Sequence, residues 1–198
     1  MSNIKRLDNT KRLVGIAIFS AIIIILQLFA TFVKFGPFAI TLALTPIVVG
    51  AAIYGMSAGA FLGGVFGLVT LIAGIFGWDP STTLLLQINP VLTAALCIVK
   101  ASAAGFLAGT AHVLLAKIDS AIGAITAAVI CPLVNTGIFC IVMILFYSET
   151  LKTWGWSGDT SALLFIIGII GVNFLLEFAV NVVLSPIIAR IIKIKAKM

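Results

Sequence analysis

Long runs of apolar residues, separated by short segments rich in Gly, Pro and charged residues, recur along the chain from Leu13 onward. A helix needs about 20 residues to cross about 30 Å of hydrocarbon. The runs predict helices at residues 13–33, 39–54, 58–76, 90–116, 120–147 and 161–192. The second is short for a crossing, and the last three exceed the bilayer thickness, so they are expected to tilt or protrude.

The breaks between the runs contain residues that end helices. Gly and Pro within residues 34–37 end the first helix. Residues 77–81 are predicted to form a loop in which Trp78 anchors at the membrane interface. Residues 82–89 are expected to form a loop or a re-entrant segment before Pro90, which suits the first turn of the next helix.

The amino-acid composition, like the long apolar runs, indicates that the protein lies in a lipid bilayer. Of the 198 residues, 62% are hydrophobic and 9% are charged, and the mean hydropathy is +1.30. A soluble domain is typically about 45–50% apolar and about 25% charged. The sequence therefore predicts an all-α, polytopic membrane protein in which residues 1–198 form a single six-helix transmembrane domain in the lipid bilayer.

Basic residues gather at the two ends of the chain and in one short break. If the N-terminus lies inside, the cytoplasmic side holds nine of them: Lys5, Arg6, Lys11, Arg12, Lys117, Arg190, Lys193, Lys195 and Lys197. The outside then holds Lys34 and Lys152. Positive charge in short loops favours the cytoplasm, so both termini are expected there. The net charge of +6 thus indicates membrane topology and not nucleic-acid binding.

Two charged residues are predicted to lie near mid-depth in the membrane. Lys100 is about ten residues into the fourth helix, and Glu177 is about sixteen residues into the sixth. A charge in hydrocarbon costs several kcal/mol by insertion scales and needs a partner or water. The two residues either form a polar ligand site or form a buried ion pair that fixes helix register. The first alternative is favoured because intramembrane charges commonly mark functional sites.

Amide side chains extend this polar region. Asn173, Glu177 and Asn181 follow i, i+4, i+8 spacing and share one helix face. Asn135 is midway along the fifth helix. Amides either bind a ligand or join helices by hydrogen bonds. For Asn135 and Asn173 the two readings are balanced, whereas for Asn181 helix joining is favoured.

Small residues repeat at four-residue spacing in two places. Gly55, Gly59, Gly63 and Gly67 form a ladder that lets another helix approach closely. Packing inside this chain is favoured over contact with a partner for this ladder. The pair formed by Ala17 and Ala21 on the first helix is a weaker signal of the same kind.

Several chemistries have no matching motif. The sequence lacks the Gly-x-x-x-x-Gly-Lys-Ser/Thr loop that binds ATP phosphates. His112 has no His or Cys at metal-binding spacing, and no paired catalytic constellation lies at membrane depth. We therefore expect no enzyme activity, no metal and no cofactor.

The second and third predicted helices resemble a known family. The stretch LTPIVVGAAIYG from Leu44 to Gly55, followed by AGAFLGGVFGL from Ala58 to Leu68, is similar to the substrate-binding S components of energy-coupling factor (ECF) vitamin transporters. The six-helix length, the basic ends and the Ala17-x-x-x-Ala21 pattern agree with that resemblance, which covers nearly the whole chain.

The resemblance implies a division of labour. An S component binds a vitamin or related small molecule from outside the bacterial plasma membrane, and an integral coupling subunit and two ATPase subunits power uptake. The small residues of the first helix dock on the coupling subunit, which here implies Ala17 and Ala21. Alternatives from other classes are a self-contained facilitator or channel for a small polar solute and, third, a membrane enzyme.

Within this family the chain is most similar to the pantothenate-type members. They share a small-residue-rich third helix, a polar-Pro element before the fourth (here Asn89-Pro90) and a basic residue along the fourth (here Lys100). A buried cation suits a carboxylate ligand, although pairing with Glu177 would weaken that inference. The expected ligand-binding residues are Lys100, Asn135, Asn173, Glu177, Gln87, Asn89, Trp78 and Phe38.

Overall fold

The computed structural model describes residues 2–32, 34–35, 38–39, 42–153, 171, 174–184, 186 and 190. Its labelled helices are α1 Ser2–Phe32, α2 Leu44–Tyr54, α3 Met56–Ile75, α4 Pro80–Ile88, α5 Pro90–Leu115, α6 Ser120–Phe146 and α7 Ser148–Thr153. A further apolar helix covers Phe174–Leu184. Two short antiparallel strands, β1 Lys34–Phe35 and β2 Phe38–Ala39, follow α1.

Four helices are long and apolar enough to cross a membrane. They are α1 over Asn9–Phe32, α3, α5 and α6. The eleven residues of α2 span only about 16 Å at 1.5 Å per residue, which is about half of the hydrocarbon thickness. The described part of the chain therefore supports a multi-pass helical membrane protein with four candidate membrane spans and shorter apolar helices.

Several elements differ from the sequence expectation. The second helix begins at Leu44 instead of residue 39, because residues 38–39 pair with β1 and Pro46 fits only near a helix start. Residues 82–88 of the segment 82–89 belong to the regular helix α4, which has Pro80 in its first turn, and Asn89 separates α4 from α5. Of the sixth predicted helix, 161–192, only Phe174–Leu184 is described as a continuous helix.

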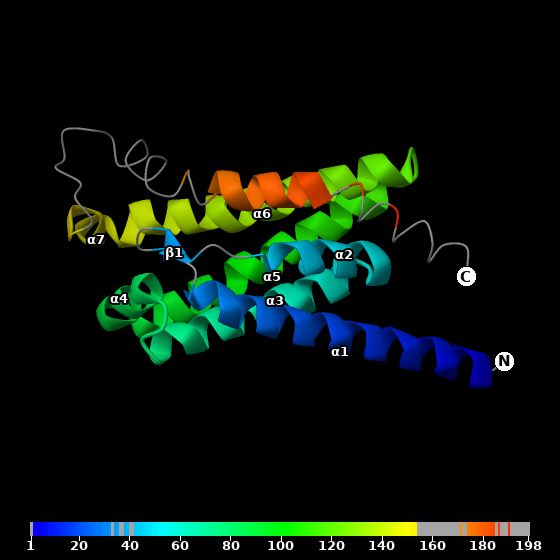
Figure 1. The fold of residues 1–198 in the computed structure, drawn as a ribbon, viewed down its shortest axis with the longest axis horizontal. Coiled ribbons are helices and arrows are strands. Elements are labelled where there is room, and N and C mark those ends of the chain that lie inside the picture. Colours follow the sequence, from blue (N-terminus) through cyan, green and yellow to red (C-terminus); the bar gives the residue numbers. More distant parts are fainter. Residues whose placement is uncertain are drawn as a thin grey trace.

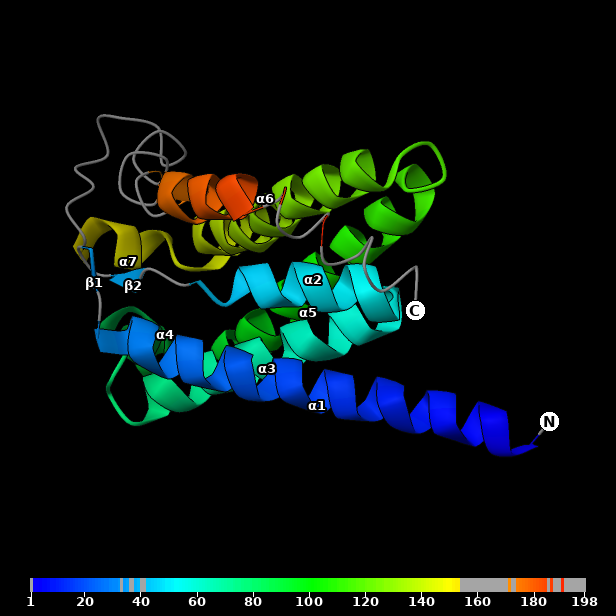
Figure 2. The same ribbon diagram turned by 45° about the vertical axis from the view of Figure 1, so that its right-hand side comes forward.

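The first helix also extends further toward the N-terminus than the apolar run. It begins at Ser2 instead of Leu13, because polar residues can continue a helix beyond the hydrocarbon, where hydropathy gives no signal. The helices lie roughly along one long axis, with the N-terminus at one end and α4 and α7 at the other (Figure 1). Turning the molecule keeps α1 beside α3 and the helix Phe174–Leu184 beside α6 (Figure 2).

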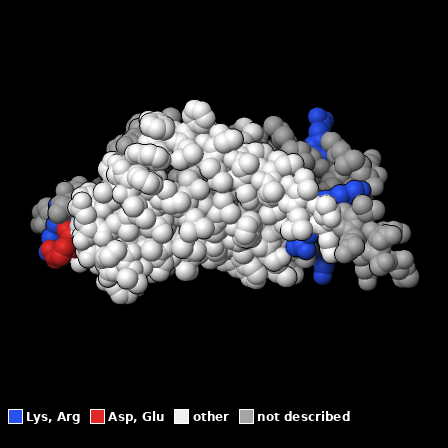
Figure 3. All heavy atoms as spheres, turned by 90° about the horizontal axis from the view of Figure 1, so that it is seen from below, with Lys and Arg blue, Asp and Glu red and all other residues white. Residues whose placement is uncertain are grey.

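The surface between the two ends is apolar. On the face drawn in Figure 3, Lys and Arg gather toward the N-terminal end, and a smaller acidic and basic cluster lies at the opposite end. The latter end contains α7, where Lys152 pairs with Glu149 at 2.7 Å. The broad zone without charge between them is the surface expected to contact lipid.

The closest packing in the fold joins α3 to α5 through glycines. A Cβ added to Gly59, Gly63 or Gly67 would overlap the backbone carbonyls of Gly105, Ala101 and Cys97, respectively. The α5 side contributes small residues too, since a Cβ on Gly105 would overlap Gly59. The glycine ladder is therefore used for packing within the chain, as the sequence favoured.

We predict that Gly63→Ala lowers the stability of the detergent-solubilised protein, because the added methyl group meets the Ala101 backbone. Overpacking of this kind typically costs about 1–3 kcal/mol. Gly137→Ala is the matched control, since a Cβ there has nothing within 4 Å and alanine is the better helix former. Thermal unfolding should rank Gly137→Ala at or above the wild type and Gly63→Ala below it. Equal midpoints would contradict close α3–α5 packing.

Candidate functional site

Lys100 lies on α5 with its side chain turned toward α6. Its ammonium nitrogen is 4.8 Å from the centroid of the Phe139 ring, a cation–π arrangement. It is half-buried, and no carboxylate among the described residues forms an ion pair with it. The aromatic face stabilises the cation without neutralising it, so the charge is available to an anion.

Glu177 occupies a different level of the molecule. It is 7% exposed on the helix Phe174–Leu184 and lies within electrostatic reach of Cys131 on α6. Cys131 and Phe139 are eight residues apart, or about 12 Å along a helix. No ion pair joins Lys100 and Glu177 among the described residues; Lys100 lies over Phe139, whereas Glu177 interacts electrostatically with Cys131, eight residues earlier on α6.

Asn135 lies between these two positions on the same face of α6. Cys131, Asn135 and Phe139 follow i, i+4, i+8 spacing, so they form one row. The Asn135 side chain is 7% exposed, and its Oδ1 atom has no hydrogen-bond partner among the described residues. A buried carbonyl oxygen without a donor costs about 1–3 kcal/mol. The Asn135 oxygen is therefore an available hydrogen-bond acceptor, one helical turn from the Phe139 ring on which the Lys100 ammonium lies.

Asn181, by contrast, has a structural role. Its Oδ1 accepts a hydrogen bond from the Thr45 hydroxyl at 3.1 Å, and its Nδ2 donates to the Glu177 carbonyl at 2.8 Å. The first of these bonds joins the helix Phe174–Leu184 to α2. This is the helix-joining role favoured by the sequence. Asn173, the third amide of that row, lies outside the described residues.

A hydroxyl network closes the end of the bundle near α4 and α7. The Thr93 and Tyr147 hydroxyls hydrogen-bond to each other at 2.8 Å, and both lie within hydrogen-bonding distance of the Asn89 carbonyl, at 2.8 and 3.3 Å, so that one donates to the other and the second donates to Asn89. The Asn89 side chain accepts from the Leu92 amide and caps α5. Asn89 thus stabilises the start of α5. Tyr147 was not among the residues expected from the sequence, although a tyrosine at the end of an apolar helix is a recognisable signal.

A cavity of about 360 Å³ lies between α4 and the α6–α7 junction. Gln87, one of the predicted ligand residues, lines it together with Tyr147 and Glu149. Trp78 does not line this cavity; it stacks on Phe76, with ring centroids 5.2 Å apart. The side chain of Phe38 lies outside the described part of the structure.

Two further buried polar groups are satisfied locally. The Asp79 carboxylate accepts hydrogen bonds from the Ser81 and Thr82 hydroxyls, each at 2.7 Å. The Gln27 amide donates to the Thr70 hydroxyl at 3.3 Å and joins α1 to α3. Neither group was selected from the sequence. The described residues contain no cluster of His, Cys, Asp and Glu able to hold a metal ion.

Ala17 and Ala21 lie on the exposed face of α1, together with Val14 and Ile18. The opposite face carries Ile23, which is fully buried. The two alanines therefore do not serve the internal packing that uses the α3 glycines. The described structure leaves this face of α1 open to lipid or to another protein.

The fold is that of a multi-pass helical membrane protein with buried polar groups. The family model for the substrate-specific component of ECF transporters matches residues 11–189, and the chain belongs to that family. The family consists of transporter components and not of enzymes.

Similar proteins agree with this assignment. The chain is 31% identical over 182 residues to the pantothenic acid transporter PanT of Lactococcus lactis subsp. cremoris (strain MG1363), covering 87% of this chain and 89% of that protein. The solved structure of ThiT from Listeria monocytogenes matches with a TM-score of 0.64 and 22% identity, covering 96% of this chain and 97% of that chain. The latter similarity supports the fold.

We predict that Asn135→Leu raises the unfolding temperature of the ligand-free protein, because it removes the unpartnered Oδ1. Asn181→Leu is the matched control and should lower it, because Thr45 then loses its acceptor. Thermal unfolding in detergent measures both. A fall of similar size for the two variants would show that Asn135 has a structural partner.

Proposed function

We propose that this chain captures pantothenate outside the bacterial plasma membrane for ATP-driven uptake. The observation that carries this proposal is the Lys100 ammonium within α5, which has no carboxylate partner among the described residues. Pantothenate is a carboxylic acid, and a charge-assisted hydrogen bond to its carboxylate would complete the site. The 31% identity to a pantothenic acid transporter supports the same ligand.

The proposed binding site lies between α5, α6 and the last helix. Asn135 accepts a hydrogen bond from a ligand hydroxyl or amide, and Asn173 and Glu177 contribute polar groups from the last helix. The cavity lined by Gln87 is proposed as its outer vestibule, because Tyr147 lines that cavity and packs in one apolar cluster with Phe139.

The residues around the entrance have secondary roles in this proposal. Asn89 positions the start of α5 through its capping bond. Trp78 and Phe38 cover apolar parts of the ligand, Trp78 from its stacked position on Phe76. Six crossings with both termini in the cytoplasm place this entrance outside, since Lys11, Arg12 and Lys117 then lie at the opposite, inner end.

The energy for uptake is proposed to come from partner subunits. An integral coupling subunit docks on the exposed face of α1 at Ala17 and Ala21, where small side chains permit close helix approach. Two ATPase subunits supply the phosphate-binding loop that this sequence lacks. The membership of the chain in the ECF substrate-specific family supports this division.

The ligand prediction compares pantothenate with pantothenol, in which an alcohol replaces the carboxylate. The wild type should bind pantothenate more tightly by about 10- to 100-fold, the worth of one charge-assisted hydrogen bond. Lys100→Met should abolish this preference while pantothenol affinity changes little. Isothermal titration calorimetry of detergent-solubilised protein measures both ligands.

Lys152→Met is the matched control, since Lys152 is exposed on α7 and pairs with Glu149. It should retain the full preference for pantothenate. The unfolding temperature of each variant separates a binding defect from misfolding, because loss of a buried charge can itself destabilise the protein. A folded Lys100→Met variant that still prefers the carboxylate would remove Lys100 from the site.

The partner prediction concerns α1. Ala17→Leu or Ala21→Leu should abolish complex formation and uptake in proteoliposomes containing the coupling and ATPase subunits, yet leave ligand affinity unchanged. Ala95→Leu, an equal enlargement at an exposed position of α5, is the control and should transport normally. Uptake at full rate by the lone wild-type chain would instead favour the self-contained facilitator.

A further inference from the structure

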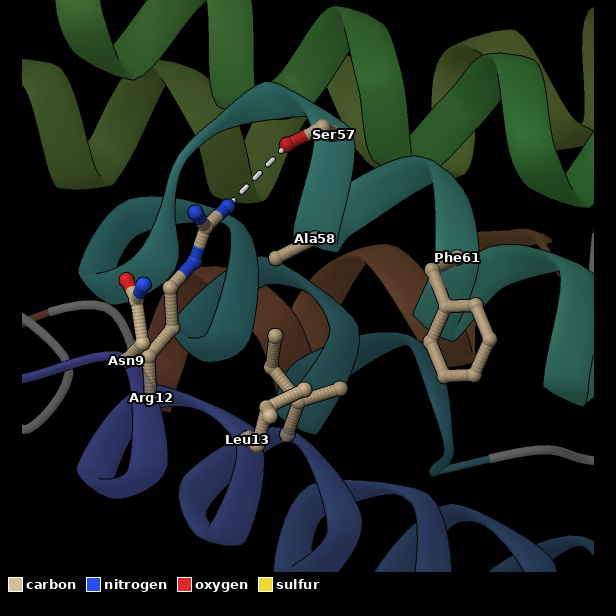
Figure 4. Close-up of a pocket in the computed structure, with 7 residues that line it drawn as sticks. Asn9, Arg12, Leu13, Ser57, Ala58 and Phe61 are labelled. Atoms are coloured by element: carbon tan, nitrogen blue, oxygen red, sulfur yellow. Dashed lines mark hydrogen bonds between the residues drawn. The ribbon is translucent and has the colours of Figure 1, made fainter. Parts of the chain in front are cut away.

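A second cavity lies at the N-terminal end of the bundle, away from the polar row of α6. It has a volume of about 450 Å³ and opens between α1 and the start of α3 (Figure 4). Asn9, Arg12 and Ser57 form its polar end, and Leu13, Ala58 and Phe61 belong to its apolar wall. The cavity thus has a cationic end joined to an apolar wall.

The Arg12 guanidinium is held in a fixed position at this cavity. Its Nη2 atom donates to the Tyr54 carbonyl at 3.1 Å and to the Ser57 hydroxyl at 3.2 Å. Tyr54 is the last residue of α2, so its carbonyl is one that the helix itself leaves unpaired. The Nε and Nη1 donors have no other acceptor among the described residues, and no carboxylate there pairs with Arg12.

The start of α3 adds positive potential at the same place. Ser57 and Ala58 lie in the first turn of α3, and the preceding Gly55 has no side chain to cap the free amides. The N-terminus of a helix carries a partial positive charge and favours anions. Arg12 and the α3 dipole therefore act together, from two different elements, on one end of the cavity.

The position of the cavity relative to the membrane indicates which kind of anion it can bind. Arg12 directly precedes the apolar run of α1, and Leu13 and Phe61 are 67% and 58% exposed. An arginine at the end of a crossing lies at the level of lipid headgroups. Anionic headgroups are attracted to basic residues at this interface. A phosphate can meet Arg12 while an acyl chain follows the apolar wall.

We propose that this cavity binds one anionic phospholipid, with the headgroup phosphate at Arg12 and the start of α3 and an acyl chain along Leu13 and Phe61. The bound lipid joins α1 to the α2–α3 turn. This site is separate from the proposed pantothenate site and does not depend on it.

The test uses the purified full-length chain, delipidated in a neutral detergent. Phosphatidylglycerol should raise the unfolding temperature by an amount on the order of 5 °C, and phosphatidylcholine at the same ratio should not. Arg12→Gln should remove the difference between the two lipids. Lys11→Gln, which removes the same charge one residue away and outside the cavity lining, should preserve it.

Further measurements separate the sources of an effect. Inorganic phosphate should not reproduce the shift, and phosphatidylglycerol should persist on the wild type, but not on Arg12→Gln, in native mass spectrometry. Because Arg12→Gln also removes two hydrogen bonds, Ser57→Leu provides a second variant that fills the polar end and should weaken the lipid response. An equal response in Arg12→Gln and Lys11→Gln, or to the two lipids, would overturn the proposal, as would full reproduction by phosphate alone.

Discussion

The contact between the glycines of α3 and the backbone of α5 constrains the rest of the fold. Gly59, Gly63 and Gly67 have no Cβ, so α3 reaches the carbonyls of α5 directly. In hydrocarbon, helices gain little free energy from burying apolar surface, so their association is stabilised mainly by close van der Waals packing. With one face of α5 committed to α3, Lys100 is turned toward α6, where it meets Phe139. The packing of α3 against one side of α5 therefore places Lys100, on the other side of α5, next to the polar row of α6.

The buried polar groups fall into two kinds once their partners are known. Asp79, Gln27 and Asn181 have partners nearby and join or terminate helices. Within the described part of the chain, the Asn135 oxygen has no hydrogen-bond partner, and the Lys100 cation lies over an aromatic ring without a paired carboxylate. Polar groups left unsatisfied at membrane depth carry a free-energy cost that a ligand can remove. This difference is the physical basis for placing the proposed pantothenate site on α5 and α6.

The two ends of the molecule serve different proposed tasks. The end that contains α4 and α7 holds the hydroxyl network and the cavity lined by Gln87, which suits entry of a polar solute. The other end holds Arg12 and the start of α3, which suits an anionic lipid headgroup. Between them, α1 is anchored by one face and leaves Ala17 and Ala21 on the other. A docked coupling subunit and a bound lipid would use neighbouring but distinct surfaces of α1.

The sequence by itself determined the helical membrane class, the family and the internal use of the glycine ladder, because apolar run length and four-residue spacing are local properties of the chain. It also singled out Lys100 and Asn135, since polar residues are rare in apolar runs. Only the tertiary structure decided which polar residues meet. Counting depth along each helix suggested that Lys100 and Glu177 could face each other, but the described residues form no ion pair between them, and Lys100 lies over Phe139 on α6. The cavity at Arg12 also required the fold, because it depends on contacts of Arg12 with Tyr54 and Ser57, which are distant in sequence.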